Sequence, residues 1–291
     1  MLWPVALAFS LLFFWGCDKE EPIPGYLYIP SITVSTNSNG TQGSNASEIV
    51  DAWVYVNGKF IGVFELPSRI PILETGKNDV LILAGIKKNG LSTERVTYPF
   101  YEQFEQKVDF GPGKIDTLNP VVKYRSICTF PWLEDFEDQR ISLEGSGSFT
   151  TIDSMYITND PFEVYGFDAI KNKYSGKIQM DTGLQFFENS SIQLFALPRS
   201  GQEIYLEFNY KTDVELSAGF YPITSSFVTG VSIVRLFPTN GVWKKAYVSL
   251  KEDVNSPQYA GAEFRMVFNA QSNNATVVPE IFFDNIKLIH F

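Results

Sequence analysis

Histidine and cysteine, which often act as catalytic bases and nucleophiles, are scarce in this chain. The single histidine, His290, lies in an apolar run, and no G-x-S-x-G sequence supplies an activated serine. One histidine and two cysteines are too few ligands for a zinc site. Paired carboxylates would suffice for glycoside hydrolysis, but no spacing distinguishes the candidates Glu134, Glu163, Glu188 and Glu280. The sequence therefore predicts a protein that is not an enzyme.

Aromatic side chains offer binding chemistry instead, because exposed tyrosine and tryptophan rings can stack on the apolar faces of sugar rings. Tyr165 and Tyr221 stand beside a glycine and a proline, which places both in predicted loops. We take these two as the ligand-binding candidates. Trp53 and Trp243 lie inside predicted strands, so a position in the core is the favoured interpretation for each.

Cys17 is a candidate site for covalent lipid. The segment 2–15 is apolar and uncharged, and Gly16 precedes the cysteine. About 14 apolar residues are too few to span a bilayer as a helix, which needs roughly 20. Residues 1–16 are therefore interpreted as a signal peptide, and Gly16-Cys17 resembles a lipobox. That resemblance implies acylation of Cys17, palmitate included, and membrane lipid as a partner. The alternatives are an uncleaved anchor and a soluble protein.

Residues 17–25 form a predicted tether, stiffened by two prolines. Its start, Asp18-Lys19-Glu20-Glu21, resembles the surface-export signal of Bacteroidota lipoproteins. The resemblance implies a lipid-anchored protein of the outer membrane that is exposed at the cell surface. The other interpretation is a solvated charged linker.

Composition favours β-structure and argues against nucleic acid as a partner. Aromatic residues make up 15% of the 291 residues, and such side chains pack well on pleated strands. The formal net charge is -10, whereas phosphate binding needs a surplus of lysine and arginine. If Cys17 carries lipid, Cys128 has no partner for an intramolecular disulfide, and we expect it to be a buried thiol.

Residues 26–125 predict a small β-sandwich. Two apolar runs, 49–56 and 59–64, flank Asn57-Gly58, which is a strong hairpin signal because a type I′ turn needs positive φ at both central residues. Further strands are predicted at 26–34, 79–86, 93–100 and 105–110. The order of the first strands and glycines resembles Ig-like or PEGA-like domains.

Residues 126–291 predict a second domain, a jelly roll. Short strands recur about every ten residues, with the clearest at 191–195, 203–210, 231–237, 243–250, 262–268 and 280–289. Strand 203–210 alternates strictly, with apolar residues on one face and polar residues on the other, which is typical of a half-buried antiparallel strand. The fold class is therefore all-β: a small N-terminal β-sandwich followed by a jelly-roll β-sandwich.

The two ends of this second region resemble a known group. Residues 130–137, FPWLEDFE, resemble the opening strand of MAM-like and carbohydrate-binding-module-like jelly rolls, and residues 282–288, FFDNIKL, resemble their last strand. The resemblance implies a structural calcium with Glu137 and Asp284 among its ligands, completed by backbone carbonyls. The alternative is a solvated acidic turn at 134–138, with Asp284 capping an edge strand.

Two short sequences resemble the Asp-Ser/Thr-apolar sequon of Bacteroidota O-glycosylation. They make Thr117 and Ser154 candidate modification sites.

Two function hypotheses follow. In the first, the chain is a non-catalytic interaction module that contacts a partner protein, within an outer-membrane complex for example, or an extracellular polymer. In the second, it is a glycan-binding accessory lipoprotein of a polysaccharide-uptake system. A glycosidase is the third and weakest alternative.

Overall fold

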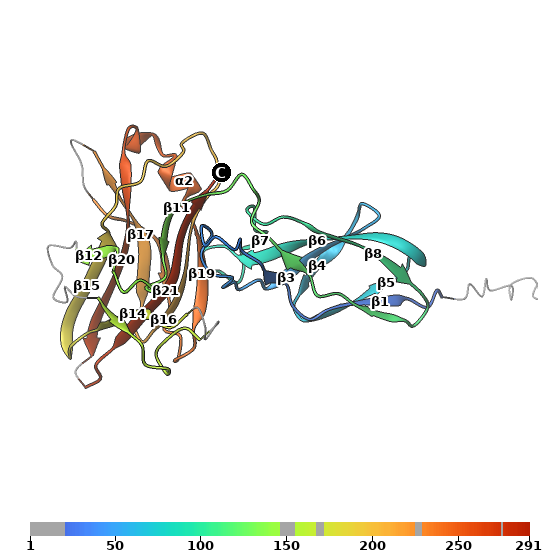
Figure 1. Ribbon diagram of the computed structural model, residues 1–291, viewed down its shortest axis with the longest axis horizontal. Helices are drawn as coiled ribbons and strands as arrows, with labels where there is room; N and C mark the ends of the chain where they lie inside the picture. Colours follow the sequence, from blue (N-terminus) through green and yellow to red (C-terminus); the bar gives the residue numbers. More distant parts are fainter. Residues whose placement is uncertain (1–20, 146–154, 167–171, 225–228, 275) are drawn as a thin grey trace, which may run out of the picture.

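The computed structural model describes residues 21–145, 155–166, 172–224, 229–274 and 276–291. Cys17 with the predicted signal peptide, and Ser154, lie outside the described residues. Nearly all regular structure is β-strand, arranged in two parts that lie end to end along the long axis (Figure 1). The predicted all-β class is confirmed. Among the described residues, no helix is long and apolar enough to cross a membrane.

The N-terminal part contains ten strands. They are β1 (Gly25–Ile29), β2 (Thr33–Val34), β3 (Asp51–Val56), β4 (Lys59–Glu65), β5 (Ser68–Ile72), β6 (Gly76–Lys87), β7 (Arg95–Thr97), β8 (Phe104–Phe110), β9 (Ile115–Thr117) and β10 (Val121–Val122). One sheet has the order β4-β3-β6-β7, with β8 also pairing with β6. Two smaller sheets, β5-β1-β9 and β10-β2, complete the sandwich.

The predicted hairpin forms between β3 and β4. Asn57 and Gly58 have φ values of 49° and 76°, as a type I′ turn requires. Val56 pairs with Lys59 across the turn. The predicted strand 26–34 is in fact two strands, β1 and β2, because Pro30 between them has no N–H for a ladder hydrogen bond.

The C-terminal part is a two-sheet jelly roll. Its strands are β11 (Thr129–Glu134), β12 (Leu143–Gly145), β13 (Tyr156–Thr158), β14 (Ser175–Gln179), β15 (Gly183–Ser191), β16 (Ile204–Thr212), β17 (Leu216–Ile223), β18 (Val231–Leu236), β19 (Lys244–Ser249), β20 (Glu263–Asn274) and β21 (Glu280–His290). A short helix, α2 (Lys251–Val254), and a 3-10 turn, η2 (Pro257–Tyr259), follow β19.

The two sheets of the jelly roll differ in what they face. We call β13-β14-β21-β16-β19, with β11 beside β21, the junction sheet, because it lies toward the N-terminal part (Figure 1). We call β12-β15-β20-β17-β18 the outer sheet. Between them, the rings of Phe208, Phe268 and Phe283 form an aromatic core with centroids 4.9 to 6.2 Å apart.

One predicted strand of the jelly roll is misplaced. Residues 191–195 were expected to form a strand, but β15 ends at Ser191. Ile192 and Leu194, which suggested the strand, are exposed, whereas the polar Asn189 and Ser190 are buried in β15. The apolar residues of segment 191–195 therefore predict a strand at the wrong place, since the strand here is the more polar segment that ends at Ser191.

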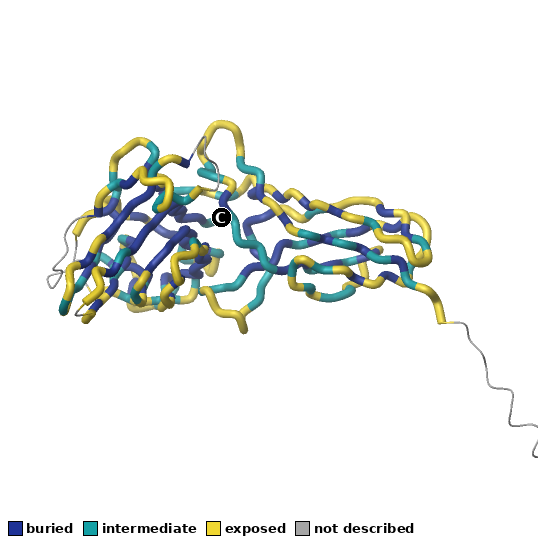
Figure 2. The backbone as a smooth tube through the Cα atoms, turned by 90° about the horizontal axis from the view of Figure 1, so that it is seen from below, coloured by how far each residue is buried: buried dark blue, intermediate teal, exposed yellow. Residues whose placement is uncertain are grey.

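Strand β16 is buried on both faces and is not half-buried as predicted. Its polar residues Glu207, Asn209 and Lys211 are all buried, although they alternate with the core residues. The backbone coloured by burial shows dark strands at the junction between the two parts (Figure 2). Tyr98 and Tyr124 of the N-terminal part cover Glu207. Lys211 is instead covered by the jelly roll itself, where its Nζ donates to the Phe162 carbonyl oxygen at 3.1 Å.

Candidate functional site

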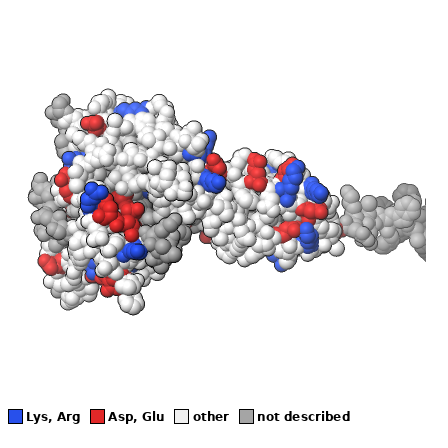
Figure 3. All heavy atoms as spheres, in the orientation of Figure 1, with Lys and Arg blue, Asp and Glu red and all other residues white. Residues whose placement is uncertain are grey.

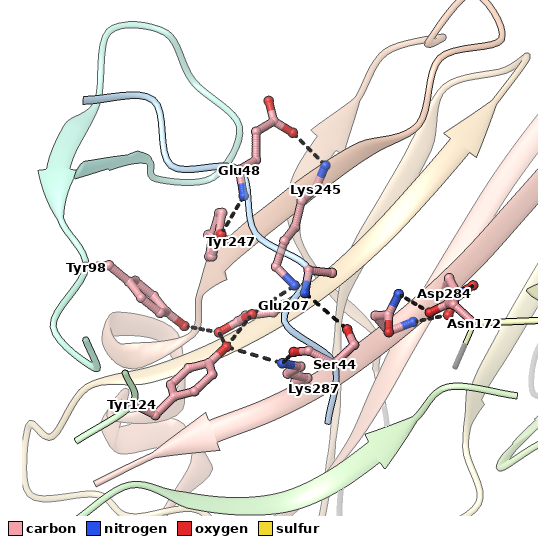
Figure 4. A network of polar contacts seen from close by, with 12 residues as sticks. Ser44, Glu48, Tyr98, Tyr124, Asn172, Glu207, Lys245, Tyr247, Asp284 and Lys287 are labelled. Atoms are coloured by element: carbon pink, nitrogen blue, oxygen red, sulfur yellow. Dashed lines mark hydrogen bonds and ion pairs between the residues drawn. The ribbon is translucent and has the colours of Figure 1, made fainter. Parts of the chain in front are cut away.

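The carboxylate of Glu207 lies in the buried part of the junction sheet and is 0% exposed. The Tyr98 hydroxyl donates to its Oε1 at 2.6 Å, and the Tyr124 hydroxyl donates to the same oxygen at 3.0 Å (Figure 4). Lys245 Nζ forms an ion pair with Oε2 at 2.9 Å. Two tyrosines of the N-terminal part thus converge on one acid of the jelly roll.

Lys287 adds a second buried amine to this cluster. Its Nζ donates to the Ser44 carbonyl oxygen at 2.6 Å. Burial lowers the pKa of Lys287 to about 7, against the opposing charge of Glu207. Burial alone would raise the pKa of Glu207, but the charges of Lys245 and Lys287 outweigh it and hold that pKa below its usual value. Glu207 is therefore a carboxylate at neutral pH.

Around this cluster the two parts contact each other through aromatic rings and through hydrogen bonds from backbone N–H groups to side-chain oxygens. The ring of Tyr98 lies 5.3 Å from that of Tyr205 and 5.0 Å from that of Tyr247, both in edge contact. The Glu48 N–H donates to the Tyr247 hydroxyl at 2.9 Å, and Glu48 Oε2 accepts from the Lys245 N–H at 2.7 Å (Figure 4). This half of the junction sheet is an internal interface, and a ligand has no access to it.

Tyr165 lies on the junction-sheet side, in the loop that follows β13. Its ring is 5.4 Å from that of Trp243 in edge contact. Burial raises the pKa of Tyr165 to about 12. The ring is therefore packed against the protein. The two predicted ligand-binding tyrosines, Tyr165 and Tyr221, belong to opposite sheets and cannot form one site.

Tyr221 is in strand β17 of the outer sheet. The prediction that it lies in a loop is wrong. The Tyr221 hydroxyl donates to Glu188 Oε1 in β15 at 2.6 Å. Strand β20 lies between β17 and β15, so the Tyr221 side chain crosses β20 above Val267, which is 2% exposed. Burial and the Glu188 carboxylate both raise the pKa of the Tyr221 hydroxyl. It stays protonated and able to donate.

Polar side chains from three strands surround Tyr221 on the outer sheet. In register, Tyr221 pairs with Arg265 and Glu188 pairs with Asn269, so these residues share one face. Arg265 forms an ion pair with Glu144 of β12. We call this surface the outer face and define it by Glu188, Tyr221, Arg265, Asn269 and Gln271. Alternating polar residues in β20 could have revealed it in the sequence.

The two predicted calcium ligands approach the same short segment, 172–175. Glu137 Oε1 accepts from the N–H groups of Lys173 and Tyr174 at 2.6 and 2.9 Å. Asp284 Oδ2 accepts from Asn172 Nδ2 at 2.8 Å and from Ser175 Oγ at 2.6 Å. The notion that Asp284 caps an edge strand is wrong, because β21 pairs with β14 and β16 and Asp284 is 0% exposed.

Two features near segment 172–175 are relevant to the expected calcium ion, a buried carboxyl group and a buried amide oxygen. Burial raises the pKa of Asp284 to about 8, and Glu137 adds to the effect. Asn285 Oδ1 is buried without a hydrogen-bond partner. In the described parts of the chain, no three Asp, Glu, His or Cys side chains form a metal cluster. A calcium ion here would therefore depend on Glu137, Asp284 and amide or backbone oxygens, which calcium accepts.

The remaining candidates occupy ordinary structural positions. Glu134 is buried and accepts from Ser142 and Phe136, while Glu163 and Glu280 both pair with Lys177. Thr117 is exposed in β9, and its glycosylation stays a prediction. Cys128 is half-buried, and burial raises the pKa of its thiol to about 11, so it is mostly unreactive.

Comparisons with known proteins return no match to any family model and none to curated proteins. Solved structures give weak likenesses. A carbohydrate-binding module of the β-sandwich superfamily covers 82% of this chain and 85% of its own, with 14% identity and a TM-score of 0.37. The CBM22-1–CBM22-2 tandem domain from Paenibacillus barcinonensis Xyn10C covers 85% and 75%, with 10% identity and a TM-score of 0.38. The enzymatically active domain of bacteriophage CBA120 tailspike protein 4 covers 54% and 20%, with 16% identity and a TM-score of 0.38. At these scores the likenesses carry no argument, and the fold is taken from its own strand order.

Proposed function

We propose that the protein is a non-catalytic glycan-binding protein and that the outer face of the jelly roll is its binding surface. The observation that supports this is the tyrosine laid across β20 and hydrogen-bonded to Glu188, with an amide and a guanidinium in register beside it. Such a surface combines an aromatic ring with directed donors and acceptors, which is the composition of sites for polar organic ligands.

Charge also favours a neutral saccharide as the ligand. Here Glu144 and Glu188 are two carboxylates against one guanidinium, Arg265, and the Tyr221 phenol is neutral, so this surface has no positive excess that would attract an anionic ligand. On the side of the molecule seen in Figure 3, acidic and basic side chains lie close together, and no broad basic area is visible. Polyanions such as nucleic acids would find little electrostatic attraction here.

Replacing Tyr221 by alanine is expected to weaken glycan binding at least tenfold, because it removes the aromatic ring of the proposed binding surface. A tenfold change corresponds to a loss of about 1.4 kcal/mol in binding free energy. The measurement is titration calorimetry with the best binder from a glycan array. Tyr156→Ala is the matched control, since Tyr156 is exposed in β13 of the junction sheet, away from the outer face. An array without any binder would contradict the proposal and favour the partner-protein hypothesis.

We further propose that an acyl group on Cys17 anchors the protein at the outer-membrane surface. The apolar segment 2–15 followed by Gly16-Cys17 supports this. Replacing Cys17 by alanine is expected to move most of the protein from the membrane fraction to the soluble fraction, because membrane retention would then lack its lipid. Immunoblots of the two fractions measure this. Unchanged membrane retention would contradict the anchor.

The third proposal is that calcium binds between Glu137 and Asp284 as a structural ion. Because burial raises the pKa of Asp284 to about 8, a bound cation would stabilise the ionised form of this side chain where the last strand passes segment 172–175.

A further inference from the structure

The N-terminal part presents a second candidate binding surface, on the side of its large sheet that faces away from its core. Strand alternation places six apolar side chains there, and we call them the aromatic platform: Trp53, Tyr55, Phe60, Val63, Leu81 and Leu83. The inward positions of β3 are instead filled by Ala52, Val54 and Val56. The prediction that Trp53 is a core residue is therefore wrong.

The platform is contiguous across three strands. Trp53 pairs with Val63 on one side and Leu83 on the other, and Tyr55 pairs with Phe60 and Leu81. The Phe60 ring lies 5.9 Å from that of Trp53 and 5.1 Å from that of Tyr55. Phe60 is 48% exposed. Val63 is 40% exposed, and the other four members of the platform are partly exposed. Apolar residues scattered singly need no explanation, but a contiguous and partly exposed apolar group is typical of an interaction surface.

The sheet is shaped to accept the Trp53 ring. A Cβ at Gly85 would lie 3.1 Å from Trp53 Nε1 and 2.7 Å from the Asp51 Cβ, so a larger residue would displace the indole. Arg95 reaches across the end of the platform, bonded to Asp51 at 2.7 Å and Glu65 at 3.3 Å. The ring is thus held in place at this end of the surface.

A polar hollow continues from the platform. It has a volume of about 740 Å³ and lies beside β6, where segment 98–103 connects β7 to β8. The hollow shares Leu83 with the platform, and it also contains Glu105, which pairs with Leu81. The other polar side chains at its wall are Thr97, Tyr98, Tyr101, Glu102, Gln103 and Arg125.

We propose that the platform and hollow together form a second site for a neutral oligosaccharide. The platform supplies aromatic rings, and the hollow beside it supplies polar groups. A sugar ring has a flat apolar face that suits the rings and hydroxyl groups that suit the carboxylates, amide and guanidinium of the hollow. An apolar protein surface would cover the platform but would also remove the charged groups Glu102, Glu105 and Arg125 of the hollow from water, which is unfavourable. The site shares its ligand class with the proposed function but none of its residues.

The test uses the purified protein with neutral hexasaccharides of glucose, xylose and mannose, each titrated in a calorimeter. Phe60→Ser is the test variant, because Phe60 is half-exposed and its loss leaves the core intact. Phe237→Ser is its control, since Phe237 is 71% exposed just after β18 of the jelly roll. The wild type is expected to show two binding events, and Phe60→Ser is expected to weaken one of them at least tenfold while Phe237→Ser weakens neither.

The variants separate this inference from the proposed function. If Tyr221→Ala removes one event and Phe60→Ser removes the other, both sites stand. If only Tyr221→Ala matters, the platform is not a glycan site and the inference is overturned. If only Phe60→Ser matters, the inference stands and the outer face is not the binding surface. A change from dimer to monomer in Phe60→Ser, measured by light scattering, would also overturn it, because the platform would then bind a second copy of the chain.

Discussion

Replacing Glu207 by alanine is expected to lower the free energy of unfolding by about 3–5 kcal/mol, because it leaves Lys245 and Lys287 as buried amines without a compensating carboxylate. Tyr98 and Tyr124 would also lose their shared acceptor. Urea denaturation followed by fluorescence measures the change. The loss should appear in the packing of the two parts against each other, and limited proteolysis near the junction should become faster.

The control for this experiment is Glu215→Ala. Glu215 pairs with Arg235 on the surface, where both side chains are largely in solvent. Exposed ion pairs contribute about 0–1 kcal/mol, so this variant should unfold almost as the wild type does. Equal losses in the two variants would show that the Glu207 cluster is no more important than a surface pair.

Chelation of calcium is expected to lower the melting temperature of the purified protein. An ion that binds only the folded state stabilises it by about 2.7 kcal/mol at a concentration 100 times its Kd. Asp284→Asn is expected to abolish the response, since it keeps the shape of the side chain but removes its charge. Differential scanning calorimetry with and without chelator measures both effects.

Asp138→Asn is the matched control for the calcium experiment. Asp138 is next to Glu137 in sequence, but its carboxylate is exposed and pairs with Arg140. Its loss should leave the calcium response intact. A wild-type melting curve that chelator does not change would remove the calcium proposal and leave the interpretation of a solvated acidic turn.

Local sequence patterns predicted the strands well where the physical cause is local. Asn57-Gly58 defines its own hairpin, since both residues accept positive φ without help from the rest of the chain. The alternation in β16 correctly located the strand, but not the burial of its polar face. The burial of Glu207 depends on Tyr98 and Tyr124, which are more than 80 residues away, and that of Lys211 depends on segment 162–163. No short-range pattern reports such contacts.

The candidate binding surfaces show the same limit. Tyr221 was chosen for its neighbouring proline, yet its place on the outer face comes from pairing within β17 and from Glu188 across β20. Tyr165 was chosen by the same reasoning but packs against Trp243. A position inside a predicted strand favours the core for Trp53, but the structure places this side chain on the outward side of its sheet. Which face is covered depends on how the sheets stack, and an apolar strand does not encode that.

The position of the first strand determines how far the jelly roll can lie from an anchor at Cys17. Strand β1, the first strand of the described chain, lies toward the end of the N-terminal part that is farther from the jelly roll (Figure 1). With an acylated Cys17, the N-terminal part would act as a stalk, and the jelly roll would be its head. The Glu207 cluster joins the two parts, so the stalk would not fold back, and the outer face would lie on the side of the molecule farthest from the anchor. If that anchor is in the outer leaflet, as we propose, the outer face would project toward polymers outside the cell.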